Sequence, residues 1–217
     1  MASTGEESSG SVRHVAFFAM GGTIDKDYPR TTNGYAFEID EPALTRVLSA
    51  LPCLNITHNV KSVCRKDSTE IEDDDRIALV EEISNSLAQQ VVVTHGTDTM
   101  IETARFVLRS GCAYDKKIAF TGAMKPERFK DSDADFNLGA AVAVTSICSK
   151  GSVIICMGGM VVSCQECFRC LETGNFLASS CGHTTCETAA MELAAKEATW
   201  QAYKMKTSGS LRSRMST

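Results

Sequence analysis

The sequence predicts an α/β fold with a doubly wound, mostly parallel sheet, and two observations carry this prediction. Short apolar runs typical of buried parallel strands alternate with longer segments of helical periodicity. The clearest run is three valines at residues 91–93, which lead through a small hydroxylic turn into a helix expected at residues 100–108. In such a sheet the carboxyl ends of the strands share one edge, where functional residues are expected.

The expected elements alternate along the chain. Strands are expected at residues 12–20, 54–64, 91–93, 117–121 and 152–157. Helices are expected at residues 41–51, 73–89, 100–108 and 136–149. Within residues 73–89 the helical period predicts one buried stripe, made of Ile77, Val80, Ile83 and Leu87. Residues 26–40 show no periodicity and predict a long loop of the kind that often serves as a lid.

Composition excludes several classes of protein. The chain has 217 residues, of which 43% are hydrophobic, and its net charge is −5, which favours neither disorder nor a nucleic-acid-binding surface. No apolar run approaches the roughly 20 residues of a membrane span. Residues 1–11 are small, polar and acidic, which predicts a disordered leader without a signal-peptide core. A cytoplasmic protein is expected.

Polar side chains follow four of the expected strands at the point where each strand ends. These are Thr23 after two glycines, Ser68, the pair Thr97 and Asp98, and residues 123–125. Asp98 can cap the helix that follows it. A carboxylate between two hydroxyls, close to a helix N-terminus, could also bind the charged ends of an amino acid. These residues alone leave a plain capped helix after a core strand as an equal alternative.

Four segments together resemble the bacterial-type L-asparaginase family, in its order and spacing, over residues 12–176. They are Gly21-Gly22-Thr23-Ile24-Asp25, Asp67-Ser68-Thr69-Glu70-Ile71, Thr94-His95-Gly96-Thr97-Asp98-Thr99-Met100-Ile101-Glu102-Thr103, and Thr121-Gly122-Ala123-Met124-Lys125-Pro126 with Phe136-Asn137-Leu138. The resemblance implies that family's N-terminal catalytic domain, which is flavodoxin- or Rossmann-like. It also implies hydrolysis of L-asparagine to L-aspartate and ammonia through a threonine acyl-enzyme, without metal or organic cofactor.

The resemblance assigns a role to each matching residue. Thr23 would be the nucleophile, and Tyr35 in the long loop would activate it. Asp98 and Ser68 would hold the amino and carboxylate groups of the substrate, and Thr97 would position a water or polarise the amide. The segments that contain Asp67 and Ala123 add these two residues to the substrate-binding set. His95 is structural in the turn by the same comparison.

Two departures from the family pattern bear on activity. Full-length relatives carry a second, smaller domain that completes the site of a neighbouring subunit, whereas only residues 177–217 follow the matching region here. A homodimer or higher homo-oligomer is nevertheless expected. The family's catalytic Lys-Asn pair falls on Arg169 and Cys170. Because Arg stays protonated and cannot accept a proton, we expect reduced activity.

The divergent tail, residues 177–217 with a helix expected near 187–204, leaves two alternatives open. Soft ligands cluster around its start, at Cys164, Cys167, Cys170, Cys181, His183 and Cys186. Such a set could bind zinc, but its spacing lacks a regular second pair, so no metal site is assigned. The other alternative is a non-catalytic paralogue that binds an amino acid.

Overall fold

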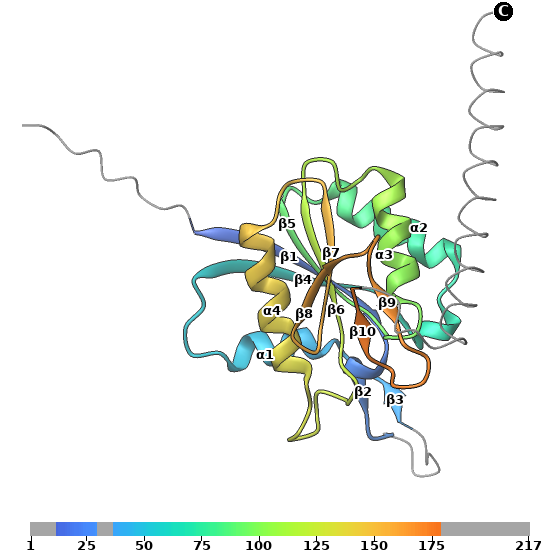
Figure 1. Cartoon of the computed structure of the whole chain (residues 1–217). Helices are drawn as coiled ribbons and strands as arrows, with labels where there is room; N and C mark the ends of the chain where they lie inside the picture. Colours follow the sequence, from blue (N-terminus) through green and yellow to red (C-terminus); the bar gives the residue numbers. More distant parts are fainter. Residues whose placement is uncertain (1–11, 30–36, 179–217) are drawn as a thin grey trace, which may run out of the picture. The chain divides into compact units, whose positions relative to one another are not determined.

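A computed structural model describes residues 12–29 and 37–178 of the chain (Figure 1). The chain divides into two compact units, residues 1–165 and 166–217. Three of the expectations from sequence lie outside the described residues: the leader at 1–11, the role of Tyr35, and the helix near 187–204. The same holds for Cys181, His183 and Cys186.

The first unit is built on a six-stranded sheet with the order β4-β1-β5-β6-β7-β8. Its strands are β1 (Arg13–Gly21), β4 (Ile56–Lys66), β5 (Gln90–Thr94), β6 (Lys117–Thr121), β7 (Ser152–Met157) and β8 (Met160–Ser163). The first five strands run parallel and β8 pairs antiparallel with β7. This arrangement confirms the predicted α/β class and its mostly parallel sheet.

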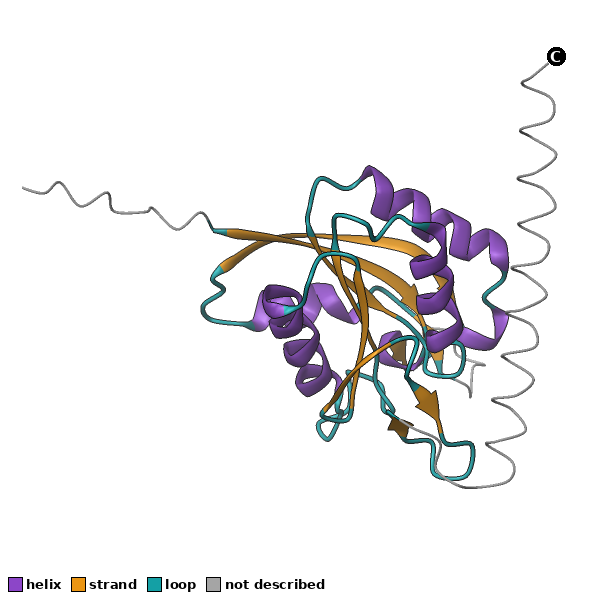
Figure 2. Cartoon of the chain, turned by 45° about the horizontal axis from the view of Figure 1, so that its top comes forward, coloured by secondary structure: helices purple, strands orange, loops and turns teal. Residues whose placement is uncertain are grey.

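Helices cover both faces of this sheet (Figures 1 and 2). The four helices of the described part are α1 (Ala43–Ala50), α2 (Asp73–Asn85), α3 (Met100–Ser110) and α4 (Ala134–Ile147). On one face, Leu44 of α1 and Leu138 of α4 share a core with Phe17 of β1 and Val92 of β5. On the other face lie α2 and α3 (Figure 1). Because both faces are covered, the middle residues of the central strands β5 and β6 are all apolar, which is why these strands can be recognised in the sequence.

The stripe predicted for residues 73–89 is correct at Ile83, which is buried, half-buried at Val80, and wrong at Ile77 and Leu87. Ile77 is 46% exposed and Leu87, which lies beyond the end of the helix at Asn85, is fully exposed. Besides Ile83, the buried positions of the helix are Arg76 and Leu79. Arg76 can take an inward position because its guanidinium donates to Thr103 and to Asp73. In the first turn of α2, a hydrogen-bonded arginine therefore takes the buried position that the apolar pattern gave to Ile77.

Two short hairpins depart from the expected elements. In the region predicted as a long loop, β2 (Lys26–Asp27) pairs antiparallel with β3 (Glu38–Ile39), so its two ends are held together. The strand β8 follows β7 through Gly158 and Gly159, both at positive φ. Two glycines between apolar runs are a known hairpin signal, and it could have predicted β8.

The described part of the second unit, residues 166–178, is a small hairpin. Its strands are β9 (Phe168–Arg169) and β10 (Phe176–Leu177). The Cys170 amide donates to the carbonyl of Asn175, and the Gly174 amide donates to the carbonyl of Cys170. No helix among residues 12–29 and 37–178 has the length and apolar character needed to cross a membrane.

Candidate functional site

The order of strands changes direction at β1. The next parallel strand in the chain, β4, lies on one side of β1, and the one after it, β5, lies on the other side. Open α/β sheets bind ligands outside the carboxyl ends of the strands at such a switch point. The turns that contain Thr23, Ser68 and Asp98 follow β1, β4 and β5, so the fold brings the predicted site segments to this point.

Glycines hold these three turns in direct contact. Ala19 of β1 is level with Thr94 of β5, so the glycines two or three residues further on meet. A Cβ atom on Gly22 would lie 2.2 Å from the Cα atom of Gly96. A Cβ atom on Gly96 would lie 2.6 Å from the Cβ atom of Ser68. Neither position has room for a side chain, and Gly22 also requires its positive φ of 85°.

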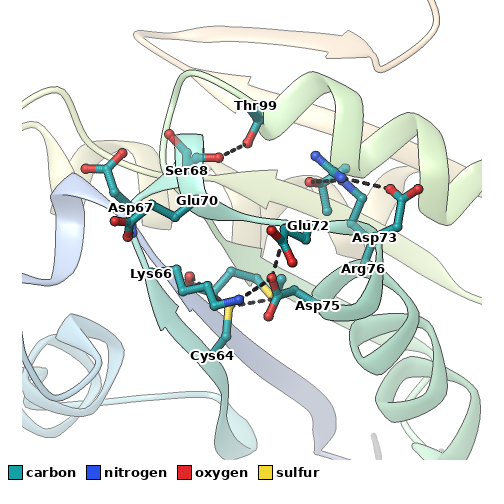
Figure 3. A network of polar contacts seen from close by, with 12 residues as sticks. Cys64, Lys66, Asp67, Ser68, Glu70, Glu72, Asp73, Asp75, Arg76 and Thr99 are labelled. Atoms are coloured by element: carbon teal, nitrogen blue, oxygen red, sulfur yellow. Dashed lines mark hydrogen bonds and ion pairs between the residues drawn. The ribbon is translucent and has the colours of Figure 1, made fainter. Parts of the chain in front are cut away.

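Ser68 and Asp98 form the polar pair of the switch point. Ser68 begins a short 3₁₀ turn, η2 (Ser68–Glu70), and is 1% exposed. Its Oγ atom lies 3.3 Å from Oδ2 of Asp98 and accepts the Asp98 amide at 3.3 Å. The Thr99 hydroxyl donates to the Ser68 carbonyl at 2.6 Å (Figure 3). A hydroxyl and a carboxylate are thus fixed side by side, and Asp98 is exposed at the edge.

The interpretation of Asp98 as a helix cap is wrong. The residue that precedes α3 is Thr99, and no side chain caps this helix. The carboxylate of Asp98 is turned toward Ser68 of the neighbouring turn. A contact between residues thirty positions apart has therefore replaced the local capping bond that sequence favoured.

Thr23 starts the 3₁₀ turn η1 (Thr23–Asp25) and is partly exposed. The next residue, Ile24, is buried in a small apolar cluster with Ala43, Ala123 and Ala134. The methyl group of Ala123 is therefore part of the packing behind the Thr23 turn, at 1% exposure. Ala123 itself therefore has only its main chain left to meet a ligand.

Asp67 ties the turn after β4 to the turn after β1. Its carboxylate lies 2.8 Å from the Lys26 ammonium, and it also caps η2 through the Thr69 amide. The hydrogen bond from Lys26 lowers the pKa of Asp67 below its ordinary value. Asp67 is thus occupied with holding the turn of Ser68.

Thr97 and His95 are buried, with Thr97 only 7% exposed and His95 fully enclosed. The His95 Nδ1 atom lies 2.8 Å from the Gly96 carbonyl, so it carries the proton and donates. Burial lowers the pKa of His95 to about 4, so the ring is neutral at ordinary pH. The backbone of His95 also donates to the Thr121 carbonyl at 2.9 Å. These contacts fit the structural role that the sequence comparison gave to His95.

Asn137 is a structural residue of the site edge whose contacts the sequence reasoning did not anticipate. Its amide nitrogen donates to the Gly122 carbonyl at 3.0 Å and to Asp133 at 2.8 Å. Its amide oxygen accepts the Gly158 amide at 2.9 Å. Asn137 therefore joins the turns after β6 and β7. The available signal was one asparagine within an apolar, small-residue helix, which indicates a buried hydrogen-bonding role.

Arg169 lies in the second unit, on β9. Its Nε atom donates to the Gly174 carbonyl at 3.4 Å, and its guanidinium carbon lies 5.8 Å from the centre of the Phe176 ring. Within the described ranges 12–29 and 37–178, no three His, Cys, Asp or Glu side chains are grouped to hold a metal ion.

A family model described as "Asparaginase, N-terminal" matches residues 14–192. The chain is 31% identical over 139 residues to a glutaminase-asparaginase of Acinetobacter glutaminasificans, which covers 61% of this chain and 42% of that protein. It is 30% identical over 160 residues to L-asparaginase 2 of Escherichia coli, covering 70% of this chain and 45% of that protein. The chain thus spans less than half the length of these relatives.

Solved structures agree on the fold. A probable cytoplasmic L-asparaginase from Campylobacter jejuni superposes with a TM-score of 0.59 at 26% identity, over 72% of this chain and 48% of the other. L-asparaginase I from Vibrio cholerae gives a TM-score of 0.62 at 18% identity, over 76% and 51%, which concerns the fold alone. Another relative, from Haemophilus influenzae, is named a probable periplasmic L-asparaginase, so the cytoplasmic location expected for this chain stays a prediction.

Proposed function

Because the chain belongs to the asparaginase family, we propose that it is an amidohydrolase that converts L-asparagine to L-aspartate and ammonia through a threonine acyl-enzyme. The observation that carries this proposal is the meeting of three turns at the switch point of the sheet. There Ser68 and Asp98 are 3.3 Å apart, and Gly22, next to Thr23, has no room for a side chain against Gly96.

The polar pair suits the two charged ends of an amino acid. The carboxylate of Asp98 can accept hydrogen bonds from a substrate ammonium group, and charge makes these bonds strong. The Ser68 hydroxyl can donate to the substrate carboxylate once a ligand competes with Asp98 for it. The two groups stay adjacent because the Ser68 side chain packs directly against the backbone of Gly96 and accepts the Asp98 amide.

The chemical step assigned to Thr23 needs a proton acceptor. Attack by the Thr23 oxygen on the amide carbon forms an ester bond to the enzyme, while the hydroxyl proton passes to a neighbouring base and then to the leaving nitrogen, which departs as ammonia. Tyr35 is the proposed activator, and Thr97 positions the water that later hydrolyses the ester. A hydroxyl nucleophile of this kind needs no metal or organic cofactor.

Arg169 is proposed to lower the rate. In the family pattern a Lys stands at this position, and a buried Lys can lose its proton near neutral pH, whereas Arg cannot. General acid–base assistance is worth about 10²–10⁴-fold in rate. We expect Arg169→Lys to raise the rate at least about tenfold, the lower part of what such assistance supplies. An unchanged or lower rate over a series of pH values would place the proton relay elsewhere.

The proposed activity is tested by ammonia release with L-asparagine, with L-glutamine assayed in parallel. Thermal stability is measured beside it, with and without L-asparagine and L-aspartate. Release with L-asparagine supports the enzyme. A thermal shift without release supports the second candidate, an amino-acid-binding paralogue, which the Arg at position 169 favours. Neither release nor shift would contradict both.

We further propose that the chain forms a homodimer through the outer face of α4. Phe136 and Ile147 at the two ends of this face are 65% and 83% exposed; between them Ala143 is exposed and Ala140 is half-buried against the core. Along this face a large side chain is followed by two small ones and then by a large one, so the pattern is the same in both directions. The α4 helix of a second chain, in antiparallel orientation, would therefore place small residues opposite small residues, as a two-fold interface requires.

Charge agrees with that orientation. Exposed Asp135 lies at the beginning of α4 and exposed Lys150 lies just beyond its end, so each acidic end would meet a basic end. Light scattering at micromolar concentration should give twice the mass of the chain, and Ile147→Glu should give the monomer mass. The control is Ile77→Glu, which changes an exposed isoleucine on α2. A monomeric parent protein would contradict the proposal.

A further inference from the structure

A buried carboxyl group lies next to the proposed nucleophile and has no place in the mechanism above. Asp25 is the last residue of η1, two positions after Thr23, and is 2% exposed. Acidic residues are almost never this buried unless they are paired or hydrogen-bonded. Its local sequence, directly after the Gly-Gly-Thr-Ile segment, gave no sign of burial.

Three hydrogen bonds make Asp25 the junction of three segments. Its amide donates to the Gly22 carbonyl at 3.1 Å and so closes the turn of Thr23. Its carbonyl accepts the Asp40 amide at 3.0 Å, where the chain leaves β3. Its side-chain Oδ1 accepts the Ala43 amide at 2.7 Å, at the first residue of α1.

Apolar packing also holds η1 against α1. Ile24 and Ala43 share an apolar cluster, and the Ile24 carbonyl accepts the Glu127 amide at 3.2 Å. The bond from Ala43 to Asp25 is therefore the polar complement of an apolar contact between η1 and α1. Loss of either would let the turn of Thr23 move against its support.

We propose that Asp25 is a positioning residue for Thr23: its buried carboxyl group, through the hydrogen bond from the Ala43 amide, fixes the η1 turn against the start of α1. This inference rests on the proposed function for the role of Thr23. The link between η1 and α1 itself can be measured without any substrate.

Charged groups around Asp25 act in both directions. Arg46 of α1 and Arg65 of β4 favour the ionised form, but each is ion-paired, with Glu127 and Glu41. Glu127 itself opposes ionisation. Burial is the largest influence and raises the pKa of Asp25 to about 7, against the lowering by the Ala43 hydrogen bond. The group therefore changes charge near neutral pH.

The sign of the pH effect follows from linkage. When η1 separates from the start of α1 (the open form), the Asp25 carboxyl group reaches water and its pKa falls toward its ordinary value of 3.8. Between that value and about 7 the closed form holds a proton that the open form releases. Opening therefore becomes easier as the pH rises through this window, and the effect is complete above it.

Asp25→Asn separates hydrogen bonding from charge, because an amide oxygen accepts the Ala43 amide but does not ionise. Hydrogen exchange at the Ala43 amide should be similar in parent and variant at pH 4, close to the lower end of the window. At pH 8 the parent should exchange at least about tenfold faster than the variant, since each pH unit of the linked window allows up to a tenfold change. Asp27→Asn, which changes a more exposed carboxylate on β2, should follow the parent at both pH values.

Amidase activity supplies the second comparison. Asp25→Ala removes the acceptor and should lower kcat by about 10²-fold, the scale expected when a reacting group is misplaced. Asp25→Asn should restore most of the rate at pH 5.5, and its kcat relative to the parent should rise between pH 5.5 and pH 8.

Two outcomes would overturn the inference. One is a ratio of Ala43 exchange rates between parent and Asp25→Asn that stays the same at all pH values. The other is a kcat in Asp25→Ala equal to that of the parent. If the parent protein releases no ammonia, the proposed function fails, while the exchange comparison still decides whether Asp25 controls the link. Unfolding curves for Asp25→Ala show whether a loss of rate arises from global unfolding.

Discussion

The two halves of the sheet's carboxyl edge are held together by different means. At the switch point, the turns after β1, β4 and β5 touch through glycine backbone, with Gly22 against Gly96 and Gly96 against Ser68. On the other half, the turns after β6 and β7 are joined by the amide of Asn137. Close packing at glycines, with added hydrogen bonds from Ser68 and Thr99, holds one half, whereas the amide of one buried side chain joins the other.

This difference indicates which polar residues are available to a ligand and which only hold the structure together. At the switch point the contact needs the absence of side chains, so hydroxyls and carboxylates of the same turns can serve a ligand. On the β6 and β7 side the polar groups of Asn137 and Asp133 are engaged with the backbone of their neighbours. We therefore expect substitutions in the first half to affect activity, in some cases together with stability, and substitutions in the second half to affect mainly stability.

The largest expected effect is that of Thr23→Ala on amidase activity. The change removes only the attacking oxygen, and loss of a catalytic hydroxyl nucleophile typically costs about 10⁴–10⁶-fold in kcat. The thermal midpoint should change little, because Thr23 is partly exposed and the packing of the turn comes from Ile24. Thr45→Ala, at an exposed position on α1, is the control. Near-parental turnover in Thr23→Ala would remove Thr23 from the mechanism.

Gly96→Ala tests the steric contact directly. The added Cβ would lie 2.8 Å from the Ser68 Oγ atom and 3.1 Å from the Gly22 Cα atom. We expect a loss of about 1–3 kcal/mol in the free energy of unfolding, as for other overpacked sites. Activity should fall as well, because the turns of Ser68 and Thr23 are forced apart.

Gly139→Ala is the matched control for this change. A Cβ there meets nothing within 4 Å, and the residue lies within α4. It should raise the free energy of unfolding by about 0.5–1 kcal/mol, the ordinary gain of alanine over glycine in a helix. If Gly96→Ala were as well tolerated as this control, the glycine contact would not organise the site.

Asn137→Ala tests the polar half. It leaves the Gly122 carbonyl and the Gly158 amide without the partner they have now, and each buried unsatisfied group costs about 1–3 kcal/mol. Chemical denaturation should show this loss, while kcat of the remaining folded protein changes less than in Gly96→Ala. Asn85→Ala, at the exposed end of α2, should stay close to the parent. A variant with normal stability but lost activity would reverse the division between the two halves.

The sequence predicted the elements that are buried on both sides and the turns that end them. Residues 91–93 and 118–120 are apolar because helices cover both faces of the sheet, so these runs can be recognised in the sequence. The family motifs placed Thr23, Ser68 and Asp98 in three separate turns, and the strand order brings these turns together.

What sequence did not predict depends on contacts between distant residues. Asp98 faces Ser68 instead of capping α3, Arg76 turns inward because Thr103 and Asp73 receive it, and Asp25 is buried by the start of α1. In each case a polar residue satisfies a partner that lies on another element. The residues next to it in sequence contain no information on that partner. Predictions from local sequence were therefore wrong for Asp98 and for the position of Arg76, and made no statement about the burial of Asp25.

The smallest expected effect is that of Lys26→Gln, which asks whether charge adds to the steric contact at the switch point. Lys26 and Asp67 connect the turns after β1 and β4, but their side chains are 27% and 34% exposed, so solvent screens the pair. Partly exposed ion pairs contribute about 0.2–1 kcal/mol, and we expect a loss of stability within that range. Since Lys26 lowers the pKa of Asp67, the contribution should be present above the ordinary pKa of 3.8 and should be lost as the pH falls through the lowered value. The measurement is a double-mutant cycle of unfolding free energies for the parent, Lys26→Gln, Asp67→Asn and the double variant. Each protein is unfolded at neutral pH and near pH 2, in low and in high salt. The cycle separates the free energy of the Lys26–Asp67 pair from the capping role of Asp67. A pairwise free energy well above this range, or one that persists in acid and in high salt, would mean that charge rather than backbone contact holds these turns together.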